Sequence, residues 1–290
     1  MLFYLFLEVR VKNMNNVLSI AGSDCSAGAG IQADLKTFVA NGVYGMTVIT
    51  SLTAQNPQKV KMLEDVSIEM LEKQIEAIFD VMEVSAVKIG MLNSKENGEV
   101  IYEKLLKYKV KNIVLDPVMI ATSGNSLIKD ETKDFLVNKL FKIVDIITPN
   151  LDETKEIVKI ILNNENIENI DSIEKMENYG KVIADFTKKW VLIKGGHLSN
   201  SAVDILMNKD EIYILEGEKI SSNNTHGTGC SLSSAIASNL AKGYSMLEAV
   251  KKAKNFVLYS IKNSIDFGEI AGTVNQMGEI YKNIDIEKLY

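Results

Sequence analysis

Short apolar runs alternate with segments of helical periodicity along most of the chain, and this alternation constrains the fold more than any other feature. The pattern is typical of β-α-β units, in which each strand of a mainly parallel sheet is followed by a helix. We therefore expect an α/β fold with a central, mostly parallel sheet flanked by helices. The predicted strands are Val17–Ile20, Met46–Thr50, Ala86–Ile89, Asn112–Leu115, Val144–Ile147 and Trp190–Ile193, with an edge hairpin of Val203–Met207 and Glu211–Leu215.

Segments with apolar residues at helical spacing separate these strands. The predicted helices are Ile31–Asn41, Ile68–Asp80, Lys95–Tyr108, Glu131–Leu140, Asp152–Ile161, Ile173–Lys188, Ser231–Ala241 and Met246–Ile261. No internal repeat or low-complexity linker interrupts them, so we expect a single domain over residues 14–290. The apolar run at residues 1–7 is too short to span a bilayer, and we expect residues 1–13 to be an N-terminal extension.

Composition excludes several classes of protein. Apolar residues make up 46% of the 290 residues and charged residues 24%, which is ordinary for a globular chain rather than a disordered one. The net charge is −6 and the basic residues are dispersed, which argues against nucleic acid as the main partner. The chain has only two cysteines, Cys25 and Cys230, which indicates a reducing cytoplasm and offers no metal-ligand spacing. No segment predicts a membrane partner.

Ligands of such folds gather at the carboxyl ends of the parallel strands, and the first of these ends is glycine-rich. The segment A-G-S-D-C-S-A-G-A-G runs from Ala21 to Gly30, and its glycines, Gly22 among them, allow the backbone to approach a ligand closely. Asp34 follows on the inward face of the next helix, where a carboxylate needs a hydrogen-bond partner. A substrate group could be that partner, or Asp34 could be an acid favoured by the helix dipole. The residues alone leave both readings open.

The next strand ends carry polar residues of weaker meaning. Gln55, in an expected loop at Ser51–Pro57, offers the donor and acceptor that would read an aminopyrimidine edge, but exposed loop glutamines are common. Asp116 and Glu153 each follow an apolar strand. They could hold Mg²⁺ through water, or they could be a turn residue and a residue of a capped first helical turn.

Two later segments could bind phosphate. Lys194 ends a hydrophobic strand and precedes two glycines, so its charge would face the ligand side of the sheet; the nearby His197 is not expected to be catalytic. The segment T-H-G-T-G-C-S enters a helix, and its Gly227 and Gly229 would let backbone N–H groups converge on an anion, as phosphoryl transfer requires. Cys230 would have a depressed pKa at that helix start.

Lys254 interrupts the apolar stripe of the predicted helix Met246–Ile261. Lysine is rarely buried without a partner. Its stem could snorkel outward, but we favour an ammonium that reaches nucleotide phosphates.

Taken together, the segments resemble the hydroxymethylpyrimidine and phosphomethylpyrimidine kinases of thiamin biosynthesis, in the ribokinase-like superfamily. The resemblance runs from about Asn16 to about Ile261. Its motifs, in the order of that family, are A-G-S-D-x-S-x-G-A-G-I-Q-A-D-L-K-T-F, T-A-Q-N, K-I-G-M-L, D-P-V-M, T-P-N-x-x-E, K-G-G-H and H-G-T-G-C.

The resemblance implies a homodimeric ATP- and Mg²⁺-dependent kinase that phosphorylates hydroxymethylpyrimidine and then its monophosphate. It implies that the pyrimidine lies near Gly22, Asp34, Gln55 and Met91, with Cys230 near the accepting oxygen and Gly227 and Gly229 in the anion hole. MgATP would meet Asp116, Glu153, Lys194, Thr228 and Lys254. A base is usually an Asp in ribokinase relatives, so Cys230 could accept the proton or only position the acceptor.

The sequence departs from the family pattern at Ala27, and two functions other than a pyrimidine kinase are open. Ala27 stands where the family usually has glycine, which predicts a stiffer first loop. A pyridoxine or pyridoxal kinase would share the fold and most motifs, and Gln55 argues against it as the main activity. A non-catalytic pyrimidine-binding protein would not need Asp116, Glu153 and Lys194.

Overall fold

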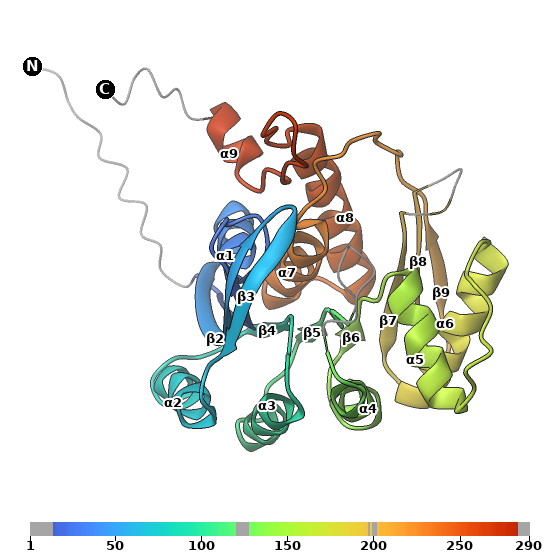
Figure 1. Cartoon of the computed structure of the whole chain (residues 1–290), viewed down its shortest axis with the longest axis horizontal. Helices are drawn as coiled ribbons and strands as arrows, with labels where there is room; N and C mark the ends of the chain where they lie inside the picture. Colours follow the sequence, from blue (N-terminus) through green and yellow to red (C-terminus); the bar gives the residue numbers. More distant parts are fainter. Residues whose placement is uncertain (1–13, 120–127, 197, 199–201, 284–290) are drawn as a thin grey trace, which may run out of the picture.

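The computed structural model describes residues 14–119, 128–196, 198 and 202–283. Its strands form one nine-stranded sheet in the order β3-β2-β1-β4-β5-β6-β7-β8-β9 (Figure 1). The six strands from β2 to β7 in this order run parallel, whereas β3, β8 and β9 pair antiparallel at the two edges. The strands are β1 Asn16–Asp24, β2 Tyr44–Asn56, β3 Lys59–Asp65, β4 Ala86–Ile89, β5 Ile113–Leu115, β6 Ile146–Ile147, β7 Trp190–Gly195, β8 Val203–Met207 and β9 Ile212–Leu215.

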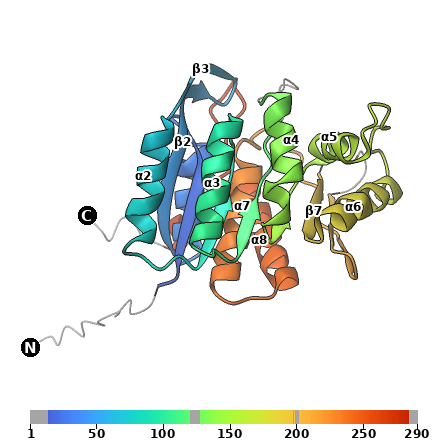
Figure 2. The same ribbon diagram turned by 90° about the horizontal axis from the view of Figure 1, so that it is seen from below.

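Helices cover both faces of this sheet. The face covered by α2, α3 and α4 is turned toward the viewer in Figure 2, with α5 and α6 continuing the layer, and α1, α7 and α8 pack on the opposite face. The helices are α1 Gly30–Ala40, α2 Ile68–Phe79, α3 Lys95–Lys107, α4 Asp130–Asn138, α5 Leu151–Leu162, α6 Ile173–Thr187, α7 Thr228–Ala241, α8 Met246–Lys262 and α9 Gly278–Asn283, with a short 3-10 helix at Leu140–Lys142.

The period-two geometry of the strands divides the apolar residues between two cores. Leu18 and Val87 face the layer of α2 and α3, whereas their neighbours Val17 and Ala86 face α7 and α8. A strand that is buried on both faces is mostly apolar along its length, and this explains the nearly continuous apolar runs in the sequence. The expected α/β fold with a mostly parallel sheet is confirmed.

The structure differs from the expected elements in three places. Residues 51–56, expected as a loop, continue strand β2 as far as Asn56, because they pair with β3. Strand β3 itself escaped prediction because all of its residues are exposed, so the sequence shows no alternation of apolar and polar positions. The short helix α9 was also missed. Residues 1–13 and His197 lie outside the described residues, and no helix within the described ranges could cross a membrane.

Gly195, the last residue of β7, lies directly against the antiparallel strand β8. It pairs with Val203 of β8, and a Cβ at this position would collide with the Val203 carbonyl oxygen and approach Met176 Cε to 2.8 Å. Any side chain here therefore has to push β8 away from β7.

We expect Gly195→Ala to lower the free energy of unfolding by about 1–3 kcal/mol, the usual cost of overpacking. Gly196→Ala is the matched control, because a Cβ at Gly196 meets no atom within 4 Å and its change should stay within about 0.5 kcal/mol. Urea unfolding of both variants measures the difference, and equal stabilities would contradict the packing at Gly195.

Candidate active site

The pyrimidine side of the expected site is built from the carboxyl ends of β1, β2 and β4. Gly22 lies in β1, and a Cβ there would come within 2.8 Å of Met91 Cε and 2.9 Å of Ser51 Oγ. Gln55 lies near the end of β2, and its backbone oxygen accepts a hydrogen bond from Cys25 Sγ at 3.1 Å. The structure therefore brings Gly22 and Met91 into contact, and it places the first loop beside Gln55.

Asp34 lies in α1 beneath this edge and is fully buried. Its carboxylate accepts hydrogen bonds from Lys88 Nζ at 2.8 and 2.9 Å, from Ser19 Oγ at 2.6 Å and from Ser234 Oγ at 2.7 Å. Asp34 is not a first-turn acid of α1, so the helix-dipole reading was wrong. Protein donors satisfy both oxygens, and direct contact of Asp34 with the pyrimidine stays a prediction.

Lys88 in β4 is the partner that the sequence reasoning missed. It is as fully buried as Asp34, and the pair forms a salt bridge. Burial lowers the pKa of Lys88, but the charge of Asp34, its hydrogen bond and the charges of Cys230 and Asp116 together outweigh this effect, and the pKa lies above its ordinary value. A charged residue within the otherwise apolar strand Ala86–Ile89 was the available signal, since a buried lysine needs a counter-ion.

The phosphate side is a cluster at the ends of β5 and β7. Lys194 Nζ lies 3.0 Å from Asp116 Oδ1, which also accepts a hydrogen bond from Thr148 Oγ1 at 3.2 Å. Burial lowers the pKa of Lys194, but Asp116 and Glu153 raise it above the ordinary value, so the ammonium stays charged. The Lys194 amide donates to the Pro149 carbonyl at 2.9 Å, which holds the T-P-N segment beside it.

Glu153 combines the two roles that the sequence left open. It completes a capping box at the start of α5, where Asn150 N donates to Glu153 Oε2 at 2.8 Å and Glu153 N donates to Asn150 Oδ1 at 2.9 Å. It is also buried, and burial raises its pKa to about 7; Lys194 lowers that pKa and Asp116 raises it. Glu153 is thus both a capping residue and a member of the charged cluster around Asp116.

The start of α7 faces that cluster. Gly227 is the N-cap residue with φ 87°, a left-handed conformation that favours glycine. A Cβ at Gly229 would lie 3.3 Å from Asp116 Oδ2 and 3.5 Å from Lys194 Nζ, so the helix N-terminus and the ammonium border one space. The Thr228 hydroxyl and the Thr228 backbone N–H both donate to the Thr225 carbonyl, at 2.6 and 3.1 Å, so a contact of Thr228 with the nucleotide stays a prediction. Helix N-termini and lysine together attract phosphate oxygens.

Cys230 corrects an expectation. The helix start predicted a depressed thiol pKa, but burial raises the pKa of Cys230 to about 11. Lys88 and a hydrogen bond from the Gly30 amide act in the opposite direction, while Asp34 and Asp116 add to the increase. Desolvation therefore outweighs the helix N-terminus, and at neutral pH Cys230 is a thiol.

Lys254 lies in α8, and its side chain contacts Asp204 of β8, the strand next to β7 and Lys194. Its ammonium is held by Asp204 Oδ2 at 2.5 Å and by the Ala202 carbonyl at 3.2 Å. Asp204 of β8 lies opposite Lys194 of β7 in the strand register. The Asp204 side chain also accepts a hydrogen bond from Gly195 N at 3.0 Å. The expected contact of Lys254 with nucleotide phosphates stays a prediction, while its pairing with Asp204 explains how α8 carries a lysine in its apolar stripe.

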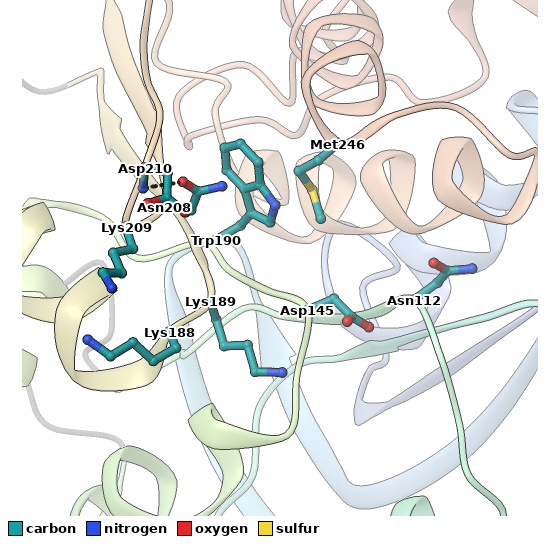
Figure 3. A pocket seen from close by; sticks show the side chains of 9 residues that line it. All are labelled: Asn112, Asp145, Lys188, Lys189, Trp190, Asn208, Lys209, Asp210 and Met246. Carbon is teal, nitrogen blue, oxygen red and sulfur yellow. Dashed lines mark hydrogen bonds between the residues drawn. The ribbon is translucent and has the colours of Figure 1, made fainter.

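Figure 3 shows a cavity that does not belong to this site. Its volume is about 390 Å³, and it is lined by residues at the amino ends of the strands, including Trp190, Asp145 and Lys189. None of the expected site residues lines it. The candidate active site therefore lies at the carboxyl edge of the sheet, as the general behaviour of parallel sheets predicts.

The raised pKa of Cys230 predicts how its thiol reacts. Only the thiolate is alkylated, and below a pKa of about 11 its fraction grows roughly tenfold per pH unit. In a Cys25→Ser background, which leaves Cys230 as the only thiol, the rate of iodoacetamide labelling should therefore rise steadily from about pH 7 to about pH 10. A rate that levels off below about pH 9, measured by mass spectrometry, would show a stabilised thiolate instead.

Comparisons with known proteins agree on one family. The family model described as phosphomethylpyrimidine kinase matches residues 24–275. A hydroxymethylpyrimidine/phosphomethylpyrimidine kinase of Aquifex aeolicus is 43% identical over 253 residues, 87% of this chain and 96% of the relative. A crystal structure of phosphomethylpyrimidine kinase from Clostridium difficile is 45% identical, with a TM-score of 0.75 over 85% of this chain and 99% of that one. The ADP complex of Bacillus subtilis pyridoxal kinase is 32% identical, with a TM-score of 0.83 over 93% and 100%.

Proposed function

We propose, because this chain belongs to the family of phosphomethylpyrimidine kinases, that it phosphorylates hydroxymethylpyrimidine and then its monophosphate in thiamin biosynthesis. The observation that carries the proposal is the space bordered by Gly229, Lys194 and Asp116, at the same edge of the sheet as the Gly22–Met91 contact. One region suits a phosphoryl group and the other suits an aromatic acceptor.

ATP is the phosphoryl donor in this proposal. Structures of pyridoxal kinase from Staphylococcus aureus with AMP-PCP and with ADP belong to chains that are 31% and 30% identical to this one. Lys194 and the backbone N–H groups of Gly229 and Cys230 would stabilise the charge on the transferred group. Since the transition state of phosphoryl transfer is loose, positioning and charge stabilisation can supply most of the rate.

Cys230 has a positioning role in this mechanism. Its raised pKa keeps it protonated, so its S–H orients the accepting oxygen rather than removing a proton. The acceptor proton is then lost to solvent or to a phosphate oxygen as transfer proceeds. The expected base, an acid in most ribokinase relatives, is not required.

The residues around Asp116 fit a magnesium ion. Two carboxylates lie close enough for Asp116 to raise the pKa of Glu153, which is the arrangement that a cation stabilises. Mg²⁺ commonly uses one or two carboxylates and keeps waters and substrate phosphates as its other ligands. We assign Asp116 and Glu153 to hold it, and when bound it neutralises phosphate charge.

Pyridoxal phosphorylation is the second candidate activity. It is favoured by the TM-score of 0.83 to the pyridoxal kinase of Bacillus subtilis, although that chain is less identical than the Clostridium difficile phosphomethylpyrimidine kinase. The Gln55 side chain, with one donor and one acceptor, suits an aminopyrimidine edge better than a pyridine that carries a hydroxyl group. We therefore rank it below the thiamin-pathway reactions.

The deciding experiment is coupled ADP release with MgATP and hydroxymethylpyrimidine, its monophosphate or pyridoxal as acceptor. We expect turnover of both pyrimidines, and Lys194→Met should lower kcat/KM by about 10²–10³ because it removes a transition-state charge contact. The exposed Lys251→Met is the matched control and should retain full activity. Turnover of pyridoxal alone would move the protein to vitamin B6 metabolism, and ligand binding without turnover would indicate a non-catalytic binding protein.

We further propose a cytoplasmic homodimer whose interface includes the β2–β3 hairpin. Strand β3 is an edge strand with all its residues exposed, and 62% of Met62, 52% of Leu52 and 47% of Val60 is exposed. Four of the seven β3 residues are charged, but Val60, Met62 and Leu63 are exposed apolar side chains, and a second copy of the chain would cover them.

Met62→Asp should therefore shift the protein from dimer to monomer in light scattering coupled to gel filtration, because a buried unpaired charge is costly at an interface. Val81, 83% exposed at the end of α2 and away from the hairpin, provides the control Val81→Asp, which should stay dimeric. A dimer in both variants would place the interface elsewhere.

A further inference from the structure

Asp24, the last residue of β1, organises the loop that leads into α1. Its carboxylate accepts hydrogen bonds from Ser26 N at 2.8 Å, from Ser26 Oγ at 2.7 Å and from Ala29 N at 2.8 Å. Burial raises the pKa of Asp24, but these bonds and that of His226 hold it well below its ordinary value. The loop is therefore wrapped around a fully buried carboxylate.

His226 joins this loop to the anion hole. Its Nε2 lies 3.1 Å from Asp24 Oδ2, and the residue directly precedes Gly227. Each of the two segments has a glycine at the contact. A side chain at Gly28 would collide with the His226 ring, and one at Gly227 would collide with the Gly28 carbonyl. The loop and the start of α7 are consequently packed backbone to backbone, with the Asp24–His226 pair beside them.

A third segment, from the C-terminal part of the chain, closes this contact. Thr273 Oγ1 lies within hydrogen-bond distance of the His226 carbonyl, at 3.0 Å, and of the Gly28 carbonyl, at 3.3 Å. Val274 N donates to the His226 carbonyl at 3.2 Å, and Gln276 Nε2 donates to Ser231 Oγ in the first turn of α7 at 3.1 Å. Segments far apart in sequence thus hold one another at the mouth of the site.

The backbone of this loop is strained at one residue. Ala27 has φ 62°, in the left-handed region that costs a residue with a Cβ roughly 1–2 kcal/mol. Strain of this kind persists only where surrounding contacts over-determine the backbone, and the Asp24 and His226 bonds are such contacts.

The loop ends at the reacting edge of the site. The Gly30 amide, directly after the residues that Asp24 holds, lies close enough to Cys230 to lower the pKa of its thiol. A displacement of the loop would therefore move the pyrimidine side, with Gly22, and the surroundings of Cys230 together. It would leave the Lys194–Asp116 contact intact, because that contact comes from β5 and β7.

We propose that Asp24 and His226, with Thr273, are positioning residues that hold the acceptor side of the site in register with the anion hole. The assignment rests on the proposed kinase function only for its kinetic readout. These residues touch no reacting atom; they act through the loop at 24–30 and the start of α7. Because a misplacement of about 1 Å can cost about 10²-fold in rate, loss of the pair should appear mainly in kcat.

The test replaces the His226 ring in two ways. His226→Phe keeps a ring but removes the donor, whereas His226→Gln keeps an N–H donor at a similar reach. We expect His226→Phe to lower kcat about 10–100-fold and to raise KM for the pyrimidine, with KM for ATP within about twofold of the wild type. His226→Gln should recover most of the loss. If the variants only contained less folded protein, kcat would fall in both, and neither KM for the pyrimidine nor KM for ATP would change.

A second readout does not depend on activity. In the Cys25→Ser background, His226→Phe should accelerate labelling of Cys230 at pH 9 at least fivefold, because the loop that covers the thiol is released. Thr273→Val, which removes only a hydroxyl, should change both readouts in the same direction if His226→Phe does not fold. Wild-type kinetics and wild-type labelling in folded variants would overturn the proposal, whereas altered labelling in a protein without kinase activity would refute only the function.

Discussion

The buried ion pair of Lys88 and Asp34 is the interaction on which the arrangement of the site depends. It connects β4 to α1 and, through Ser19 and Ser234, also to β1 and α7. A buried charge that loses its partner costs about 3–5 kcal/mol, so these four elements are held to one geometry. The helices joined in this way, α1 and α7, both begin at the site.

The pair also sets the electrostatics above it. Lys88 lowers the pKa of Cys230 and Asp34 raises it, so the two charges act against each other at the thiol, and desolvation is the largest effect. The phosphate cluster is different, because Lys194 is balanced by Asp116 and Glu153 and its charge faces the start of α7. A neutral thiol on one side and a paired cation on the other fit an acceptor alcohol and a phosphoryl group, respectively.

The fold at the site follows a simple principle, since each parallel strand delivers its last residues to the same edge. Gly22, Met91, Asp116 and Lys194 come from four strand ends in different parts of the chain. The cavity at the amino edge, lined by Trp190 and Lys189, shows that a hollow by itself does not mark chemistry. At the carboxyl edge, it is the convergence of backbone N–H groups and charged side chains that marks the site.

The sequence by itself determined the central strands, the flanking helices and the positions of the glycine-rich segments, because burial on both faces and helical periodicity are written locally. It also marked Asp116, Glu153, Lys194 and Gly229 as residues of strand and helix ends. Only the tertiary structure decided that Asp34 pairs with Lys88, that Lys254 pairs with Asp204, that the Cys230 pKa is raised and that His226 meets Asp24. Those properties depend on desolvation and on partners 50 or more residues away, which no local pattern records.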